Sequence, residues 1–214
     1  MRKGQATRAM VLDHAFTLVS RVGFEGLTIG TLAERVGLSK SGLFGHFHSK
    51  EQLQLEVLET AVDRFMQGVI RPGLKAPRGE PRVRALFKNW LDWGRGHVAQ
   101  TEGCVFIAAA NELDDRQGPL RDRLVDYQRE WLAGLAHAAQ LAVEEGHFRF
   151  DLDTQQFAYE FYSIILAFHH ASRLLRDSRS DERAERQFER LITNSRPTPR
   201  SALAPPRATT APTS

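Results

Sequence analysis

The run from Thr28 to Lys50 (TIGTLAERVGLSKSGLFGHFHSK) constrains the fold of this chain more than any other stretch. Apolar residues in its first part recur at i, i+3, i+4 and i+7 and so share one helical face: Ile29, Leu32, Ala33 and Val36. Gly37 follows where a helix ends in a left-handed residue, and Ser39 can cap a second short helix. In that second helix Leu43 and Phe47 are four residues apart and face inward. Two short helices about a glycine turn predict a helix-turn-helix, whose second helix enters the major groove of DNA.

The outward side of the second helix supplies the candidate contacts to DNA. Lys40 begins this helix and has the reach for a phosphate or a guanine edge, while Ser41 and Gly42 allow the backbone to approach closely. Helix capping accounts for Thr28 and Ser39 as well as DNA contact does. The predicted DNA-binding residues are Thr28, Ser39, Lys40, Ser41, Gly42, Phe44, His46 and Lys50.

A recognition helix this short reads few bases, so useful specificity requires two copies. A twofold homodimer would present two such helices about 34–36 Å apart, one turn of DNA, to a palindromic operator. The predicted partners are therefore operator DNA and a second copy of the chain.

The residues of the first quarter of the chain also carry a family resemblance. From Val11 to Leu53 the chain resembles the DNA-binding domain of the TetR/AcrR family of bacterial one-component regulators. The matching features are Ala15 and Phe16, Gly23-Phe24, Thr28-Ile29, Leu32-Ala33, Gly37-Leu38-Ser39, Gly42-Leu43-Phe44, His46-Phe47 and the run from Ser49 to Leu53.

This resemblance implies a homodimeric, ligand-responsive transcriptional regulator, most often a repressor released from its operator by a small molecule. It places His46 and Lys50 where the family contacts phosphates. The family usually has tyrosine where this chain has Phe44, which keeps the ring but lacks the hydroxyl that would hydrogen-bond a phosphate.

The charge of the chain is unevenly distributed. Residues 1–50 carry seven Lys and Arg against three Asp and Glu, a balance of +4, whereas residues 51–214 carry twenty-two against twenty-three, a balance of −1. Because neutralisation of phosphates supplies most non-specific affinity for DNA, the positive excess lies where DNA contact is predicted.

Composition narrows the class further. The chain is 42% hydrophobic and 26% charged, as in ordinary globular proteins, and no apolar run reaches the roughly 20 residues of a membrane span. The N-terminus has no apolar core of a secretory signal, and the single cysteine, Cys104, fits a reducing cytosol. We therefore expect a cytoplasmic protein with no membrane partner.

Helical periodicity continues through the rest of the chain, without a strand pattern or an internal repeat, and predicts an all-α fold of about nine helices. Besides the helix-turn-helix, the predicted helices span about 6–22, 50–70, 81–98, 103–113, 120–145, 153–175 and 181–193. The stretch 71–81, rich in proline and glycine, is predicted to be a loop. The predicted organisation is a helix-turn-helix domain at 1–50 with the motif at about 28–47, a ligand-binding and dimerisation domain at 51–194, and a disordered tail at 195–214.

The resemblance implies a small-molecule cavity within the second domain. Candidate lining residues are Phe65, Met66, Phe87, Trp90, Phe106, Asn111, Tyr127, Trp131, Phe161, Phe168 and His169. Aromatic residues at helical spacing are more often core, so an ordinary core remains the alternative for each of them. A cavity with these walls would suit a bulky apolar or aromatic effector better than a phosphate or a sugar.

The last two predicted helices suggest the dimer interface. The helix at 153–175 is apolar over most of its circumference, which indicates burial on more than one side. The resemblance implies that these two helices of each subunit pair across the twofold axis as an intersubunit four-helix bundle, and a central core helix at 153–175 is the alternative. The predicted interface residues are Tyr162, Leu166, Phe188, Leu191 and Ile192.

Catalytic and metal chemistry have little support in the sequence. The histidines are scattered, and no HExxH, CxxC, GxGxxG or P-loop spacing occurs, so no catalytic residue, metal or cofactor is predicted. Two other functions stay open: a helical enzyme or carrier that uses the core cavity, and a ligand-independent DNA-binding dimer with a fully packed core.

Overall fold

The computed structural model describes residues 3–96 and 104–197. Its helices are α1 (Lys3–Val22), α2 (Ile29–Val36), α3 (Lys40–Phe47), α4 (Lys50–Phe65), the π turn η1 (Met66–Ile70), α5 (Arg71–Leu74), α6 (Glu80–Gly94), α7 (Val105–Leu113), α8 (Pro119–Glu144), α9 (Thr154–Arg173) and α10 (Ser180–Ser195). The predicted all-α fold, a helix-turn-helix followed by a larger helical domain, is confirmed. Because α4, η1 and α5 follow one another without a break and form one continuous rod, the described residues contain the expected nine helical segments.

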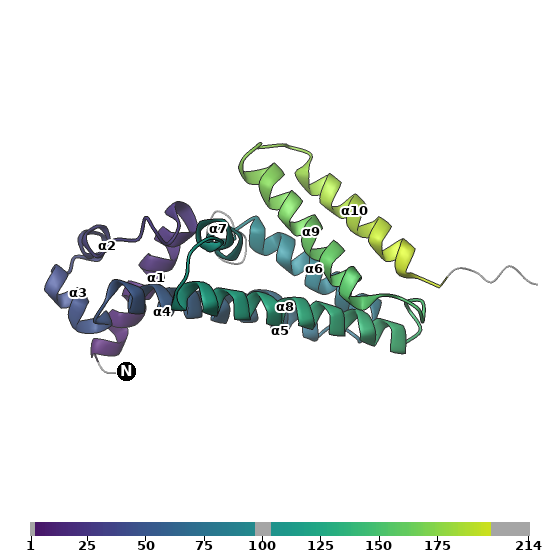
Figure 1. Cartoon of the computed structure of the whole chain (residues 1–214), viewed down its shortest axis with the longest axis horizontal. Coiled ribbons are helices and arrows are strands. Elements are labelled where there is room, and N and C mark those ends of the chain that lie inside the picture. The colour runs from purple at the N-terminus through teal and green to yellow at the C-terminus, as the bar shows by residue number, and fades with distance from the viewer. Residues whose placement is uncertain (1–2, 97–103, 198–214) are drawn as a thin grey trace, which may run out of the picture.

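The molecule is elongated, with α1, α2 and α3 at one end (Figure 1). The rod from α4 to α5 and the long helix α8 run lengthwise beside each other, α6 lies behind them, and α9 and α10 pair at the other end (Figure 1). Helix α7 lies between α1 and the body, so the small domain contacts the large one through both α4 and α7.

The helix-turn-helix forms because its ends are satisfied locally. The Thr28 hydroxyl accepts a hydrogen bond from the Thr31 N–H at 3.1 Å, and the Ser39 hydroxyl accepts one from the Gly42 N–H at 3.0 Å. Gly37 ends α2 at φ +68°, a conformation that costs glycine no side-chain clash. The inner faces of the two helices are fully covered, since Leu32, Leu43 and Phe47 show no exposed surface.

The rod beginning at Lys50 runs further than its sequence pattern predicts. The structure corrects the predicted loop 71–81, because residues 71–74 are helical and α6 begins at Glu80. Pro72 has no N–H to donate, and in a regular helix its ring would clash with the carbonyl of Gly68. The wider turn η1 occupies this position and lets the chain stay helical through the proline. Gly73 then packs against Leu86 of α6, where a Cβ would approach the Leu86 side chain to 2.5 Å.

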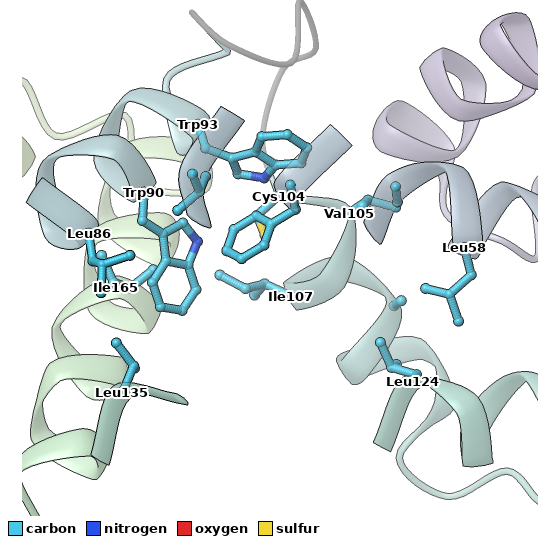
Figure 2. Packing of buried hydrophobic residues seen from close by; sticks show 14 of the residues in the cluster. Leu58, Leu86, Trp90, Trp93, Cys104, Val105, Ile107, Leu124, Leu135 and Ile165 are labelled. Atoms are coloured by element: carbon cyan, nitrogen blue, oxygen red, sulfur yellow. The ribbon is translucent and has the colours of Figure 1, made fainter. Parts of the chain in front are cut away.

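The core is rich in aromatic rings. The ring of Phe65, at the end of α4, meets four others edge-on, with centroids 5.1–5.9 Å away, on α6, α7 and α8: Trp90, Trp93, Phe106 and Trp131. Figure 2 shows the neighbouring packing, with Trp90 and Trp93 on two sides of Cys104 at the start of α7. Phe87 stacks face to face on Phe188 at 3.8 Å and so joins α6 to α10.

Three sequence predictions fall partly outside the described residues. They are the end of the helix at 81–98, the start of the helix at 103–113, and most of the tail at 195–214. The first residue of that tail is Ser195, which is helical and ends α10.

An ion-pair network joins the start of α6 to the end of α10. The Glu80 carboxylate accepts hydrogen bonds from Arg84 at 2.7 Å and from Arg196 at 2.6 and 2.8 Å. Arg84 in turn contacts Glu189 of α10 at 2.9 Å. The hydrogen bonds from Arg196 and Arg84 outweigh the effect of burial and lower the pKa of Glu80 to about 2 from its ordinary 4.5.

This network predicts a pH-dependent contribution to stability. Because the pKa of Glu80 is lower in the folded chain, its stabilisation is present above pH 4.5 and is lost as the pH falls toward 2. We expect Glu80→Gln to lower the melting temperature at pH 7 by about 2–4 °C, the shift that about 1 kcal/mol produces at this size. The difference from the parent protein should shrink between pH 4.5 and 2 in melting curves. Glu34→Gln, at an exposed position of α2, is the control, and a pH-independent difference would contradict the assignment.

Candidate nucleic-acid interface and internal cavity

One end of the molecule gathers the residues predicted to meet DNA. Thr28, Ser39, Ser41 and Gly42 are exposed at the starts of α2 and α3, and Phe44 is 45% exposed on the outer face of α3. His46 is half-buried, and its ring lies 6.3 Å from that of Phe47. The two hydroxyls that cap α2 and α3 therefore serve the structure, whatever else they contact.

Lys40 lies back over α2. A Cβ added to Gly30 would lie 3.5 Å from Cε and 3.7 Å from Nζ of Lys40, so the ammonium group sits beside the first turn of α2. The free N–H groups of a helix start and a nearby cation both favour an anion. This arrangement suits a DNA phosphate better than a base edge.

Lys50 is held differently. Its Nζ donates to the Glu25 carbonyl at 3.4 Å, and the residue borders a hollow of about 390 Å³ between the α1–α2 turn and the α7–α8 corner. The structure thus separates Lys50 from the outer face of α3, although both belong to the same end of the molecule.

That hollow contains a second connection between the two parts of the chain. The Glu112 carboxylate, near the end of α7, accepts hydrogen bonds from the backbone N–H groups of Phe24, at 2.8 Å, and of Glu25. Gly23 is required beside it, because its φ is +76° and a Cβ there would lie 2.5 Å from Glu112 Oε2. Arg116 pairs with Glu25 at 2.6 Å across the same gap. We call these contacts the Glu112 clamp. Sequence reasoning missed it because 88 residues separate Glu112 from Phe24.

The large domain encloses a cavity of about 460 Å³ beside the rod. Six of the eleven predicted lining residues border it: Phe65, Met66, Trp90, Phe106, Tyr127 and Trp131. Its walls are mostly apolar, and Arg82, Glu130 and His137 are the ionisable side chains among those that border it, besides Tyr127 and Tyr162. Gly134 of α8 forms part of the rim, which the sequence gave no reason to single out.

The other five predicted lining residues do not border the cavity. Phe87 and Phe161 form core contacts with Phe188, and Phe168 is buried beside Gly94. Asn111 is exposed on α7, so it lies on the surface. His169 is half-buried outside the cavity lining, and burial lowers its pKa to about 4. For Phe87, Phe161 and Phe168, helical spacing predicted inward faces correctly but did not distinguish packed core from open space.

Two tyrosines on the wall are fixed by hydrogen bonds. Tyr162 donates to Gln128 Oε1 at 3.1 Å, and Tyr127 donates to Glu59 of α4. Burial raises the pKa of Tyr162 to about 12, with a further contribution from Cys104. Burial raises the pKa of Tyr127 to about 12 as well, reinforced by Glu59. Both phenols therefore stay protonated donors at neutral pH.

The predicted dimer interface needs correction. Phe188, Leu191 and Ile192 are 3%, 7% and 0% exposed, so they pack inside the subunit and leave no surface for a partner. Tyr162 faces the cavity. Leu166 remains accessible at 39% on α9, which also carries the more exposed Tyr159 and ends at the exposed cap residue Leu174.

Neither a metal-binding cluster nor a membrane-spanning helix is found among the described residues. Residues 3–96 and 104–197 contain no group of three His, Cys, Asp or Glu side chains placed to hold a metal ion. Among the helices described, none is both long and apolar enough to cross a membrane. Cys104 is buried, and burial raises the pKa of its thiol.

Residues 11–57 match the model of the bacterial regulatory proteins of the tetR family, and residues 79–188, just over half of the chain, match the tetracyclin repressor-like C-terminal domain. The transcriptional repressor KstR2 of Rhodococcus jostii is 26% identical over 151 residues, which cover 69% of this chain and 71% of that protein. The regulator RutR of Escherichia coli is 29% identical over 167 residues, covering 73% and 76%.

Solved structures agree in fold. A TetR transcriptional regulator from Chloroflexus aurantiacus superposes with a TM-score of 0.76 at 27% identity, over 90% of this chain and 96% of that one. A regulator from Cytophaga hutchinsonii gives 0.82 at 18% identity, over 93% and 99%. AibR, solved with isovaleryl coenzyme A and operator DNA, gives 0.70 at 21% identity, over 88% and 99%.

A helix-turn-helix at one end of a helical body with an internal cavity defines a ligand-responsive, DNA-binding transcriptional regulator. The family models and relatives agree with this class. The chain belongs to the TetR family of bacterial regulators.

The position of Lys40 predicts the salt dependence of DNA binding. Loss of one phosphate contact should weaken binding to all sequences about equally and reduce the slope of log affinity against log salt by about 1. We expect this result for Lys40→Ala in mobility-shift titrations at several salt concentrations. Lys75→Ala, an exposed lysine just after α5, is the matched control and should change neither quantity. An unchanged slope for Lys40→Ala would exclude the phosphate contact.

The Glu112 clamp predicts a local effect on the small domain. Replacing Glu112 with alanine leaves the N–H groups of Phe24 and Glu25 without their acceptor, so their amide protons should exchange faster. The melting temperature should fall by about 2–4 °C. Glu112→Gln keeps one acceptor oxygen and should lie between the two proteins. Equal exchange in all three proteins, measured by NMR, would remove the clamp from the account.

Proposed function

We propose that this chain is a homodimeric repressor that binds a palindromic operator and leaves it when a small, uncharged, apolar or aromatic effector enters the cavity. The observation that carries the proposal is the position of the cavity. Phe65 and Met66, at the end of α4 and the start of η1, form part of its wall. The same rod begins at Lys50, two residues after α3 ends with its cap at His48. An effector that displaces Phe65 therefore acts on the helix to which the DNA-binding end is attached.

The effector class follows from the size and lining of the cavity. A volume of about 460 Å³ lies within the range for small-molecule sites, and phenylalanine, tryptophan, leucine and isoleucine side chains make up much of the wall. Glu130, Gly134 and His137 of α8 are exposed and so border the opening. An apolar body inside, with any polar group directed toward this opening, fits the arrangement. AibR shows that a member of this fold class can hold a small molecule and operator DNA.

The cavity also bears on the two other functions. A ligand-independent dimer would have a fully packed core, which the open space beside the rod disfavours. For an enzyme, the ionisable side chains of the cavity would have to act together on a substrate. The side chain of Arg82 instead donates to the carbonyl of Ala76, at 3.3 and 3.1 Å, within its own subunit. We propose that the cavity binds its ligand without transforming it.

The proposed dimer uses the outer face of α9. Tyr159, Ser163, Leu166, His170 and Leu174 follow one another at intervals of three or four residues and form one row. Tyr159 and Leu174 are 66% and 70% exposed, an apolar surface that a second copy would cover. A twofold axis beside α9 and α10 would pair two helices from each subunit.

Coupling between the sites need only be modest. A difference of about 1–3 kcal/mol between effector-bound and free forms changes operator affinity about 5–150-fold. The rod and the Glu112 clamp both attach the small domain to the large one, so a tilt of the rod moves the small domain relative to the clamp residues. In a dimer, this movement changes the distance between the two recognition helices.

Filling the cavity tests the effector site. A Cβ added to Gly134 meets no atom within 4 Å, so Gly134→Leu should place its side chain in the opening without a clash. We expect the variant to bind an uncharged fluorescent probe, N-phenyl-naphthylamine, at least about tenfold more weakly, because about 1.4 kcal/mol of lost contact suffices. DNA affinity should be unchanged.

The neighbouring Ala133, which is exposed and outside the cavity, supplies the matched control. Ala133→Leu adds a similar side chain on the same helix and should bind the probe as the parent protein does. Equal probe binding by all three proteins would refute the effector site.

A further inference from the structure

The outer face of α3 carries few side chains that could form hydrogen bonds with the edge of a base pair. Leu43 and Phe47 are fully buried, which leaves Lys40, Ser41, Gly42, Phe44 and Gly45 exposed along the helix. Two of these positions have no side chain. The helix that must read DNA therefore carries few groups that can form hydrogen bonds.

The polar side chains on this face lie beside the helix caps. The Ser41 hydroxyl lies 3.1 Å from that of Ser39, within the cap of the helix. Lys40 lies over Gly30 of α2, beside a site suited to a phosphate. Phe44 is left as the largest outward side chain, with 45% of its surface exposed.

Glycines on both sides bring this ring closer to DNA. A Cβ at Gly45 would meet no atom within 4 Å, and one at Gly42 would meet only the Ser39 hydroxyl at 3.2 Å. Crowding by the protein interior therefore does not explain why either residue is glycine. Their lack of side chains instead allows the helix backbone to approach the groove, so that the ring of Phe44 can reach the floor.

We propose that Phe44 is a specificity-determining residue that reads the methyl group of a thymine in each half-site. The phenyl ring has no hydrogen-bonding group, so pressing it against the donors and acceptors of guanine, adenine or cytosine would desolvate them without compensation. Thymine presents a C5-methyl group in the major groove, the one apolar feature there. The inference depends on DNA binding, and it does not depend on the effector or on the sign of regulation.

The test removes only that methyl group. The full-length protein first selects its site from a library of random duplexes, and each thymine of the selected site is then replaced in turn by deoxyuridine. Replacement in only one of the two half-sites should weaken binding about fourfold, since burying one such carbon contributes about 0.8 kcal/mol. Replacement in both half-sites should weaken it about 16-fold, because the two contacts are equivalent.

Phe44→Ala supplies the second arm. Its affinity should be lower than that of the parent protein, and it should no longer distinguish deoxyuridine from thymidine at that position. Its salt dependence should match that of the parent protein, because the ring neutralises no phosphate. Phe44→Tyr keeps the ring and should keep the methyl dependence. With cytosine at the same position, 5-methylcytosine should be bound more tightly than cytosine, because it restores the methyl group alone.

Each result decides the proposal. It is overturned if deoxyuridine is tolerated at every thymine, if the loss persists in Phe44→Ala, or if the selected half-site has no thymine. Selection of a single half-site would contradict the homodimer while leaving the methyl readout tested at one position. Circular dichroism is the control for folding, and the variants should match the parent protein because the changed side chain is exposed.

Discussion

The meeting of Phe65 with four aromatic rings is the interaction on which the rest of the structure depends. The edges and faces of Trp90, Trp93, Phe106 and Trp131 surround it, at interplanar angles between 76° and 88°. Each such pair contributes about 0.5–1.5 kcal/mol beyond the area it buries, and edge-on contact depends strongly on ring orientation. The cluster fixes α4 against α6, α7 and α8 at once. Because Phe65 also borders the cavity, no ligand can fill that side of the cavity without touching the contact that positions α4.

The two ends of α4 explain how such a contact affects DNA binding. At its start, the Ser49 hydroxyl accepts a hydrogen bond from the Gln52 N–H at 3.0 Å, directly after α3 and its cap. Along its length, Arg64 lies over the ring of Phe16 at 4.3 Å and pairs with Asp13, which ties α1 to the same rod. Helices α1 and α3 are thus both fastened to α4. A tilt of α4 must move them together, and it would shift the small domain relative to the Glu112 clamp and to Trp93 of α6, whose ring lies 6.5 Å from that of Phe16.

How much of this could be predicted from sequence depended on distance along the chain. The caps at Thr28 and Ser39, and the stop at Gly37, are local interactions, and each occurs as the residues predict. The Glu112 clamp could not be predicted, because the pattern around Glu112 resembles that of any exposed helix end. Periodicity predicted correctly which faces of α9 and α10 point inward, but it did not predict what those faces contact. Tyr162 therefore proved to face a cavity and Phe188 a ring of α6, although both had been predicted to meet a second subunit.

Net charge also proved an incomplete guide to the DNA-binding end. Of the basic residues there, Arg8 pairs with Glu56 of α4 and lies over the ring of Phe47 at 5.3 Å, and Lys50 is bound to the Glu25 carbonyl. These cations stabilise the small domain and are less available to phosphates. Lys40 instead lies beside the start of α2, where free N–H groups also favour an anion. When fewer cations contact the phosphates of the duplex, a larger share of the affinity has to come from contacts to the base edges in the groove. Under these conditions an exposed phenyl ring, flanked by glycines, contributes a larger share of the discrimination between DNA sequences.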